Sequence, residues 1–263
     1  MIVTAMISAA GVAGAAWGGF RARGGGWSDA KLFCGGGMSN LGHVFNEDAS
    51  VFPGDPAPII EIVADLETDG YLVEEVTTGV HTGTHLDAPL HFVNDDARSI
   101  DEFDAEEFVW PAFVIDVRDR MASDGPDFQL SVSDIRRAER SQGRIPDGAM
   151  VIIQTGFDAY FGTPAYENDF PGFSGDAVQW MFDERDIAGV GSDTFGPDAW
   201  SDETYAATYT ALLNDGLALP GLNNVDSLHA NGDLIIAPPV RLENGSAFMV
   251  NPIACHRTDR WND

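Results

Sequence analysis

The chain has 263 residues, of which 44% are hydrophobic, and this composition is typical of a globular protein with a substantial core. Its 42 acidic and 14 basic residues give a formal net charge of -28 at pH 7. A surface of this sign repels nucleic acid and anionic membranes, so we expect neither as a partner.

The acidic residues are dispersed along the whole chain, and Lys31 is the only lysine. At low ionic strength so many like charges would destabilise a compact fold, whereas at molar salt the Debye length falls to about 3 Å and the repulsion is screened. We interpret the acidity as adaptation to a salt-rich cytoplasm. An acidic surface that binds a cationic partner is the alternative, which the even dispersal disfavours.

Residues 1–20 form an uncharged segment rich in alanine and glycine, and the first cations, Arg21 and Arg23, follow it. Export signals carry their positive charge before the apolar segment, and a membrane span would be longer and poorer in glycine. We therefore interpret residues 1–37 as a flexible extension, or as the result of a translation start placed too far upstream. Residues 38–263 are expected to form one domain.

Two cysteines and three of the six histidines show no pattern of a functional site. Cys34 and Cys255 are too few for a disulfide scaffold and lack the spacing of a metal site, so we expect both to be inert. His43, His229 and His256 have no metal-ligand partner at a useful spacing.

The most informative segment is VHTGTHLDAPLHF, residues 80–92, which holds the other three histidines within eleven residues. Its threonines, glycine and proline oppose a helix, so we expect an extended strand. Alternate residues of a strand share one face, and here these are His81, His85, Asp87 and His91. A flat strand would separate His81 from His85 by about 13 Å, so the chain must curl, as Gly83 permits.

A curl would bring His81, His85 and Asp87 around one divalent cation, because imidazole nitrogens and a carboxylate oxygen suit zinc or manganese. Open coordination positions would admit water, and bound water whose pKa falls toward ~7 supplies hydroxide at neutral pH. His91 would then act as general base or acid. Each histidine alone could be an ordinary polar residue, but the cluster on one face indicates a catalytic metal site.

Downstream of this segment the predicted strands and helices alternate. In chain order they are a strand at 111–117, a helix at 131–143, a strand at 149–155, a helix at 174–186, a strand at 187–193, a helix at 202–216, and strands at 233–240 and 247–253. This alternation from about residue 110 onward predicts an α/β domain.

The motif HxGTHxDxPxHF of residues 81–92 resembles the signature of the cyclase family of metal-dependent hydrolases, which includes bacterial-type kynurenine formamidases and isatin hydrolases. Three further segments fit the family in the same order: VFPGDP at 51–56, IIQTGF at 152–157 and GVGSDTFGPD at 189–198. The similarity extends from about residue 38 to the carboxyl end.

The resemblance implies a mixed, partly barrel-like β-sheet core flanked by helices, the swivelling β/β/α fold, in a homodimer or homotetramer. It implies hydrolysis of a C–N amide bond, with N-formylkynurenine, cleaved to kynurenine and formate, as the first candidate. His81, His85 and Asp87 match the family's metal ligands, and His91 matches its catalytic histidine. Ring opening of an isatin-like cyclic amide is the alternative, and a non-catalytic metal- or ligand-binding protein is the second.

Two positions depart from the pattern of the two-metal formamidases, which carry a histidine in a late helix and a glutamate in the following strand. Tyr209 stands in place of the histidine, and Asn223 or Asn224 stands near the glutamate's place. The resemblance therefore implies one zinc or manganese ion, with Asn223 as the candidate fourth ligand. The alternative is that Asn223 satisfies a turn after Pro220 and Gly221.

Two more residues are candidates for the substrate pocket. Phe52 takes the place of the family's pocket aromatic, although a lone apolar residue could equally belong to the core. Asp193 would either contact a ligand or anchor a turn under the site, and we favour the turn.

Overall fold

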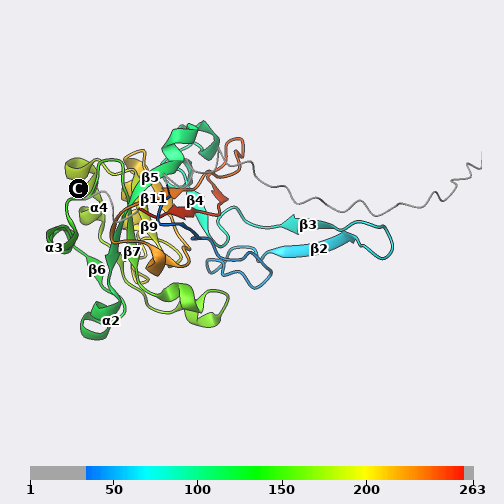
Figure 1. The fold of residues 1–263 in the computed structure, drawn as a ribbon, viewed down its shortest axis with the longest axis horizontal. Coiled ribbons are helices and arrows are strands. Elements are labelled where there is room, and N and C mark those ends of the chain that lie inside the picture. Colours follow the sequence, from blue (N-terminus) through cyan, green and yellow to red (C-terminus); the bar gives the residue numbers. More distant parts are fainter. Residues whose placement is uncertain (1–33, 258–263) are drawn as a thin grey trace, which may run out of the picture.

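A nine-stranded mixed sheet forms the centre of the computed structural model, which describes residues 34–257 except for the side chain of Ala122 (Figure 1). Of the extension predicted at 1–37, residues 1–33 lie outside the described residues. In spatial order the strands are β1 (Met38–Asn40), β13 (Ile253–Cys255), β11 (Asn231–Ile236), β5 (Val109–Asp116), β7 (Met150–Gln154), β9 (Gly189–Ser192), β10 (Leu217–Leu219), β4 (His85–Asp87) and β12 (Ala247–Met249).

The middle of the sheet is parallel and buried on both faces. Strands β5, β7, β9 and β10 run parallel, and the helices α3 (Val132–Gln142), α4 (Gly175–Arg185) and α5 (Ala206–Leu213) lie in the connections between them. Met150 and Ile152 of β7 pack into one core, and Val151 and Ile153 pack into a second core that also holds residues of the three helices. This burial explains the uninterrupted apolar run in the sequence.

The predicted helices are confirmed, and local capping explains where they begin. Asp134 accepts a hydrogen bond from the Ser131 N–H ahead of α3, and the Ser174 hydroxyl accepts one from the Ala177 N–H in α4. The third helix is shorter than predicted and begins only at Ala206, because the Asp202 carboxylate holds the preceding residues in a turn by accepting N–H groups.

The predicted strand at 247–253 is in fact two strands, β12 and β13, which are seven strand spacings apart in the sheet order. In a flat sheet that separation would be roughly 34 Å, whereas the connection of Val250, Asn251 and Pro252 spans about 14 Å at most. The sheet must therefore curl until its two ends approach each other. This curl confirms the predicted partly barrel-like α/β fold.

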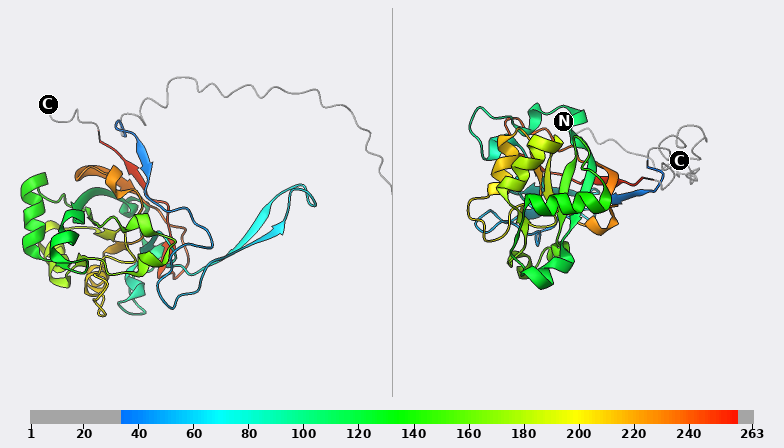
Figure 2. Two further views of the ribbon diagram at one scale, coloured as in Figure 1. Left: turned by 90° about the horizontal axis from the view of Figure 1, so that it is seen from below. Right: turned by 90° about the vertical axis from the view of Figure 1, so that its left-hand side faces the viewer.

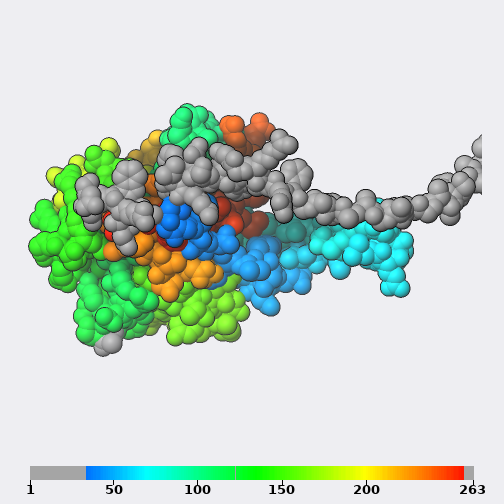
Figure 3. Space-filling model, viewed as in Figure 1, coloured from blue at the N-terminus to red at the C-terminus, as the bar shows by residue number. Residues whose placement is uncertain are grey.

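A long hairpin, which the sequence analysis did not predict, projects from the body as an arm (Figures 2 and 3). It consists of β2 (Ile59–Ala64) and β3 (Val73–Thr77), which pair antiparallel. Short elements complete the fold: α2 (Arg118–Asp124), the pair β6 (Gln129–Leu130) and β8 (Gly172–Phe173), and the 3₁₀ helices η1 (Pro89–His91), η2 (Ile100–Glu102), η3 (Ala105–Phe108), η4 (Phe157–Tyr160), η5 (Pro164–Glu167) and η6 (Val225–Ser227).

The prediction that both cysteines are inert is wrong, because Cys34 and Cys255 form a disulfide. They are 221 residues apart in sequence, and the pairing of β1 with β13, in which Met38 lies opposite Cys255, brings them together. Residues 34–37 are therefore fastened to the sheet. No helix within the described part of the chain is both long enough and apolar enough to cross a membrane.

Candidate metal centre and pocket

The segment that carries the histidines is extended only at β4, which lies between β10 and β12. Gly83 adopts a φ of 64° just before the strand and makes the predicted curl. After the strand, Pro89 starts η1, so His91 lies in a 3₁₀ turn and not on the extended strand that the sequence analysis predicted. Proline suits this position because its fixed φ matches the first residue of a helical turn.

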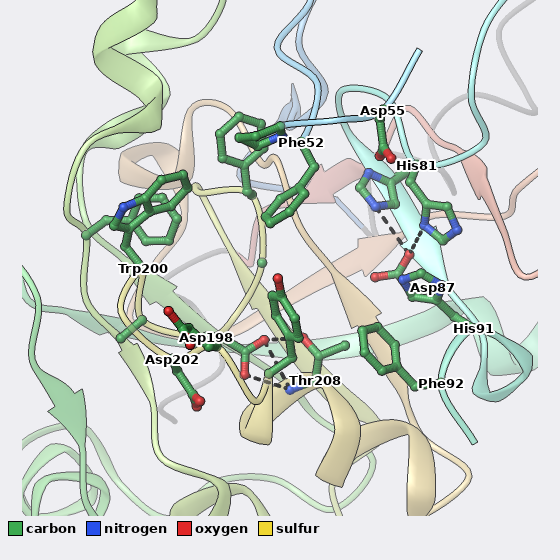
Figure 4. Close-up of a pocket in the computed structure, with 18 residues that line it drawn as sticks. Phe52, Asp55, His81, Asp87, His91, Phe92, Asp198, Trp200, Asp202 and Thr208 are labelled. Atoms are coloured by element: carbon green, nitrogen blue, oxygen red, sulfur yellow. Dashed lines mark hydrogen bonds and ion pairs between the residues drawn. The ribbon is translucent and has the colours of Figure 1, made fainter.

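The curl brings His81, His85 and Asp87 together. Figure 4 shows His81 and Asp87 side by side. Asp87 Oδ1 is 2.8 Å from His81 Nδ1 and 3.2 Å from His85 Nε2. His85 Nδ1 lies 2.8 Å from the carbonyl oxygen of Gly83, which orients the ring so that its other nitrogen faces Asp87. One carboxylate oxygen and two imidazole nitrogens converge on one point, and this donor set fits a divalent cation.

The charge state of the group suits metal binding. Burial raises the pKa of Asp87, but the charge of His85 and hydrogen bonds with His81 and His85 outweigh it and hold that pKa well below its ordinary value. Asp87 is therefore ionised at neutral pH although it is only 4% exposed.

His91 lies beside this group without belonging to it. Its ring stacks on His81 with 3.9 Å between the centroids and meets Phe92 edge-on, while one side of the residue remains open to solvent. Desolvation by these neighbours, together with repulsion from His81 and His85, lowers the pKa of His91 to about 4. The imidazole is therefore neutral at pH 7 and can accept a proton.

The metal-ligand group forms one wall of a cavity of about 510 Å³. In Figure 4, His81, Asp87 and His91 lie on one side, and Asp198, Trp200 and Asp202 lie across the cavity. The aromatic lining residues are Phe52, Phe92, Phe170, Phe195, Trp200 and Tyr205. Besides Asp87, the acidic lining residues are Asp55, Asp198, Asp202 and Glu203, and no described lysine or arginine lines the cavity.

The structure separates the two predicted pocket residues. Phe52 lines the cavity and makes edge contacts with Phe195 and Tyr205. Asp193 does not line it: the side chain is fully buried and accepts hydrogen bonds from Thr155 N–H, Thr155 Oγ1 and Gly156 N–H. Asp193 is thus a turn anchor at the end of β7, the role that the sequence analysis favoured, and its candidacy as a pocket residue is wrong.

The candidate fourth ligand, Asn223, also lies outside the cavity. Its side-chain oxygen accepts the N–H of Asn224 at 2.9 Å in the turn before η6, as the alternative turn role predicts. On α5, Tyr209 is 42% exposed, and its neighbour Thr208 faces the cavity. The Thr208 hydroxyl donates a hydrogen bond to the Asp198 carboxylate. The sequence analysis missed both residues, because nothing local shows which side of α5 faces the site.

The prediction that His229 and His256 lack partners is wrong, because Asp233 joins them in a second group of possible ligand atoms within 4.8 Å of one another. The spacing of four residues between His229 and Asp233 was a usable signal. His256 could not be found this way, since sheet pairing places it there. His43 lies outside both groups and stacks on Phe161.

Comparisons with known proteins agree with the resemblance seen in the sequence. A family model described as "Putative cyclase" matches residues 39–199. The isatin hydrolase of Roseibium aggregatum is 28% identical over 215 residues, which cover 75% of this chain and 81% of that one. A kynurenine formamidase of Bacillus thuringiensis is 26% identical over 217 residues, 81% of this chain and 95% of that one. The solved structure of isatin hydrolase A from Labrenzia aggregata, bound to benzyl benzoate, aligns with a TM-score of 0.81 and 29% identity, covering 88% of this chain and 98% of that one.

Proposed function

Since the chain belongs to the cyclase family, we propose that it is a metal-dependent hydrolase that cleaves the C–N bond of an aromatic amide. The observation that carries this proposal is the convergence of His81, His85 and Asp87 on the wall of an aromatic cavity, with His91 beside them but outside the ligand group. A purely binding protein would need the ligands but no free imidazole next to them.

The three ligands would hold one divalent ion, zinc or manganese, which when bound supplies Lewis acidity and lowers the pKa of water. Asp87 contributes a negative charge that its two histidine neighbours maintain against the opposing effect of burial. His85 is oriented through the Gly83 carbonyl. The neutral His91 accepts a proton at a ring nitrogen as water attacks the amide carbon, and returns it to the nitrogen that leaves.

Two substrates are supported by the named relatives, N-formylkynurenine and an isatin-like lactam. The acidic lining residues could pair with the α-ammonium group of N-formylkynurenine, but no described lysine or arginine lines the cavity to pair with its carboxylate, and this absence favours the lactam. A neutral lactam needs no such partner. Its hydrolysis breaks the ring C–N bond and creates a carboxylate, which the acids of the lining would repel and help to release.

The test uses chelator-treated protein in molar potassium chloride, assayed with N-formylkynurenine and with isatin before and after zinc or manganese is added. Metal-dependent turnover of isatin alone would support a lactam as the substrate. Turnover of N-formylkynurenine alone would support the formamidase function. Turnover of neither by folded, metal-loaded protein would contradict the proposal for both substrates and favour the non-catalytic alternative.

We also propose a homodimer or homotetramer in which the β2–β3 arm contacts a second copy. The arm exposes several apolar side chains, among them Ile62 at 67%, Val63 at 56% and Val76 at 50%. An isolated two-stranded hairpin is only marginally stable in water, and such a surface is typical of an interface. Light scattering should give a multiple of the chain mass that falls to one chain in Ile62→Glu/Val76→Glu, and a monomeric parent protein would refute the idea.

A salt-rich cytoplasm remains our proposal for the location, supported by the dispersed acidic residues. In that location the Cys34–Cys255 disulfide would require a cytoplasm less reducing than usual, because such bonds persist mainly in oxidising compartments.

A further inference from the structure

A second group of histidines and a carboxylate lies outside the cavity. It is on β11 and next to β13, near one edge of the sheet, whereas β4 is near the opposite edge. Asp233, on β11, is fully buried. Its Oδ1 is 2.8 Å from His229 Nδ1, and its Oδ2 is 2.8 Å from His256 Nδ1. Both imidazoles thus direct the same type of nitrogen at one carboxylate, from the loop before β11 and from the end of β13.

The carboxylate is held rigidly and lacks a permanent countercharge. The N–H groups of His229 and Arg257 each donate to one of its oxygens at 2.9 Å. Its ion pairs among the described residues involve only the two histidines, neither of which carries a fixed charge as lysine or arginine does. A buried carboxylate is costly without a cation. Each oxygen has one backbone N–H and one imidazole nitrogen as partners, so a cation placed between the carboxylate and the two rings would replace the imidazole hydrogen bonds and keep the backbone ones.

The surroundings of His256 also suit a metal ligand. Its Nε2 lies 2.8 Å from the Ser39 hydroxyl of β1. A neutral ring that donates Nε2–H to this hydroxyl leaves Nδ1 free to bind a metal, as outer-shell partners of metal-binding histidines do. The His229 side chain is 42% exposed, so an ion can enter from solvent.

We propose that His229, Asp233 and His256 form a second divalent-cation site of the zinc class, with a structural role distinct from catalysis. Two imidazole nitrogens and a carboxylate are a common zinc donor set, and water can complete the coordination. The ion would connect β11 with the end of β13 next to Cys255, and through Ser39 it would secure β1. The site would therefore stabilise the edge at which the described chain begins and ends.

The test counts zinc per chain by mass spectrometry after chelation, zinc reloading and gel filtration. Molar potassium chloride suppresses weak binding to surface acids, and reductant is omitted to keep the disulfide. We expect two equivalents in the parent protein, one in His229→Gln, one in the cavity variant His85→Gln and none in the double variant. Asp226→Asn, an exposed acid outside both groups, is the control and should retain two.

The His85→Gln protein decides the question even if His229→Gln fails to fold, because its second group is intact. It should still bind one zinc, and its melting temperature should rise when zinc is added and fall back when a chelator removes the ion. A parent protein with one zinc, lost entirely in His85→Gln, would overturn the proposal and leave Ser39, His256 and Asp233 as a metal-free hydrogen-bond network.

Discussion

His91 differs from the other two histidines of the cavity in the contacts that position its ring. His81 and His85 both contact the Asp87 carboxylate, whereas among the described residues no side-chain hydrogen bond holds the ring of His91. Stacking on His81 positions the ring, and its lowered pKa keeps it neutral at pH 7. These properties suit a group that exchanges protons and not one that binds the metal.

His91→Ala should therefore keep its cavity metal and lose activity. General acid–base catalysis is worth about 10²- to 10⁴-fold, and kcat should fall within that range. Metal content and turnover are to be measured on the same sample. Unchanged turnover would remove His91 from the mechanism, and loss of the metal would make it a ligand.

Asp198 should make the free energy of unfolding depend on pH, whereas asparagine at the same position should not. Burial raises the pKa of Asp198 from 3.8 to about 6, against hydrogen bonds from Thr208 and Ala207 that lower it. Because the folded state binds this proton more tightly than the unfolded state, the contribution is complete below pH 3.8 and is lost as the pH rises through about 6.

Asp198→Asn can keep the bond from the Ala207 N–H and has no charge to bury. Relative to this variant, the free energy of unfolding of the parent should fall by roughly 1 to 3 kcal/mol between pH 4 and pH 7. Denaturant titrations of both proteins at each pH measure the difference. A difference that does not change with pH would show that Asp198 ionises near its ordinary pKa.

Among the elements, the short β4 depends on a close approach of two loops. Gly221, after β10, has a φ of 67°, and a Cβ there would lie 2.6 Å from the carbonyl oxygen of Gly83. That carbonyl is the one that orients His85, and the Thr84 hydroxyl donates to the Gly221 carbonyl. The loop after β10 therefore holds the metal-binding turn in place.

Gly221→Ala should weaken both the fold and the cavity metal site. Positive φ costs about 1 to 2 kcal/mol in alanine, and the forced contact adds about 1 to 3 kcal/mol. Gly148→Ala is the matched control, because its φ is 69° and nothing lies within 4 Å of the added Cβ. Zinc titration should show weaker cavity binding for Gly221→Ala only, and equal affinities would disprove the link.

At the scale of the whole molecule, the net charge destabilises the fold and the topology stabilises it. The net charge of -28 repels itself over the entire surface. The curled sheet and the disulfide oppose expansion by joining segments from the two ends of the described chain, since β1 pairs with β13 and Cys34 is bonded to Cys255. Ionic strength should therefore decide how much of that stability remains.

The melting temperature should rise by roughly 5 °C or more between 0.1 and 2 M potassium chloride at pH 7, because the Debye length falls from about 10 Å to below 3 Å. The increase should shrink at pH 4, where many carboxylates are partly protonated. Differential scanning calorimetry at both pH values measures it. A melting temperature that falls with salt at pH 7 would contradict the interpretation of the acidity.

The sequence by itself determined those features that depend on neighbours a few residues away. Ser131 and Ser174 mark helix starts, the apolar run at 149–155 marks a strand buried on both faces, and the glycine between His81 and His85 allows the curl that unites them with Asp87. Capping, burial pattern and backbone freedom are local properties, so they can be deduced from spacing.

Only the tertiary structure decided which distant segments meet. The partnership of Cys34 with Cys255, the contact of His256 with Asp233 and the choice of Thr208 over Tyr209 all depend on strand order, register and the rotation of a helix. The same holds for the arm, whose exposed apolar residues resemble a core strand in sequence. Local spacing carries no information about these contacts, because a shift of one residue in register turns every side chain of a strand to the opposite face.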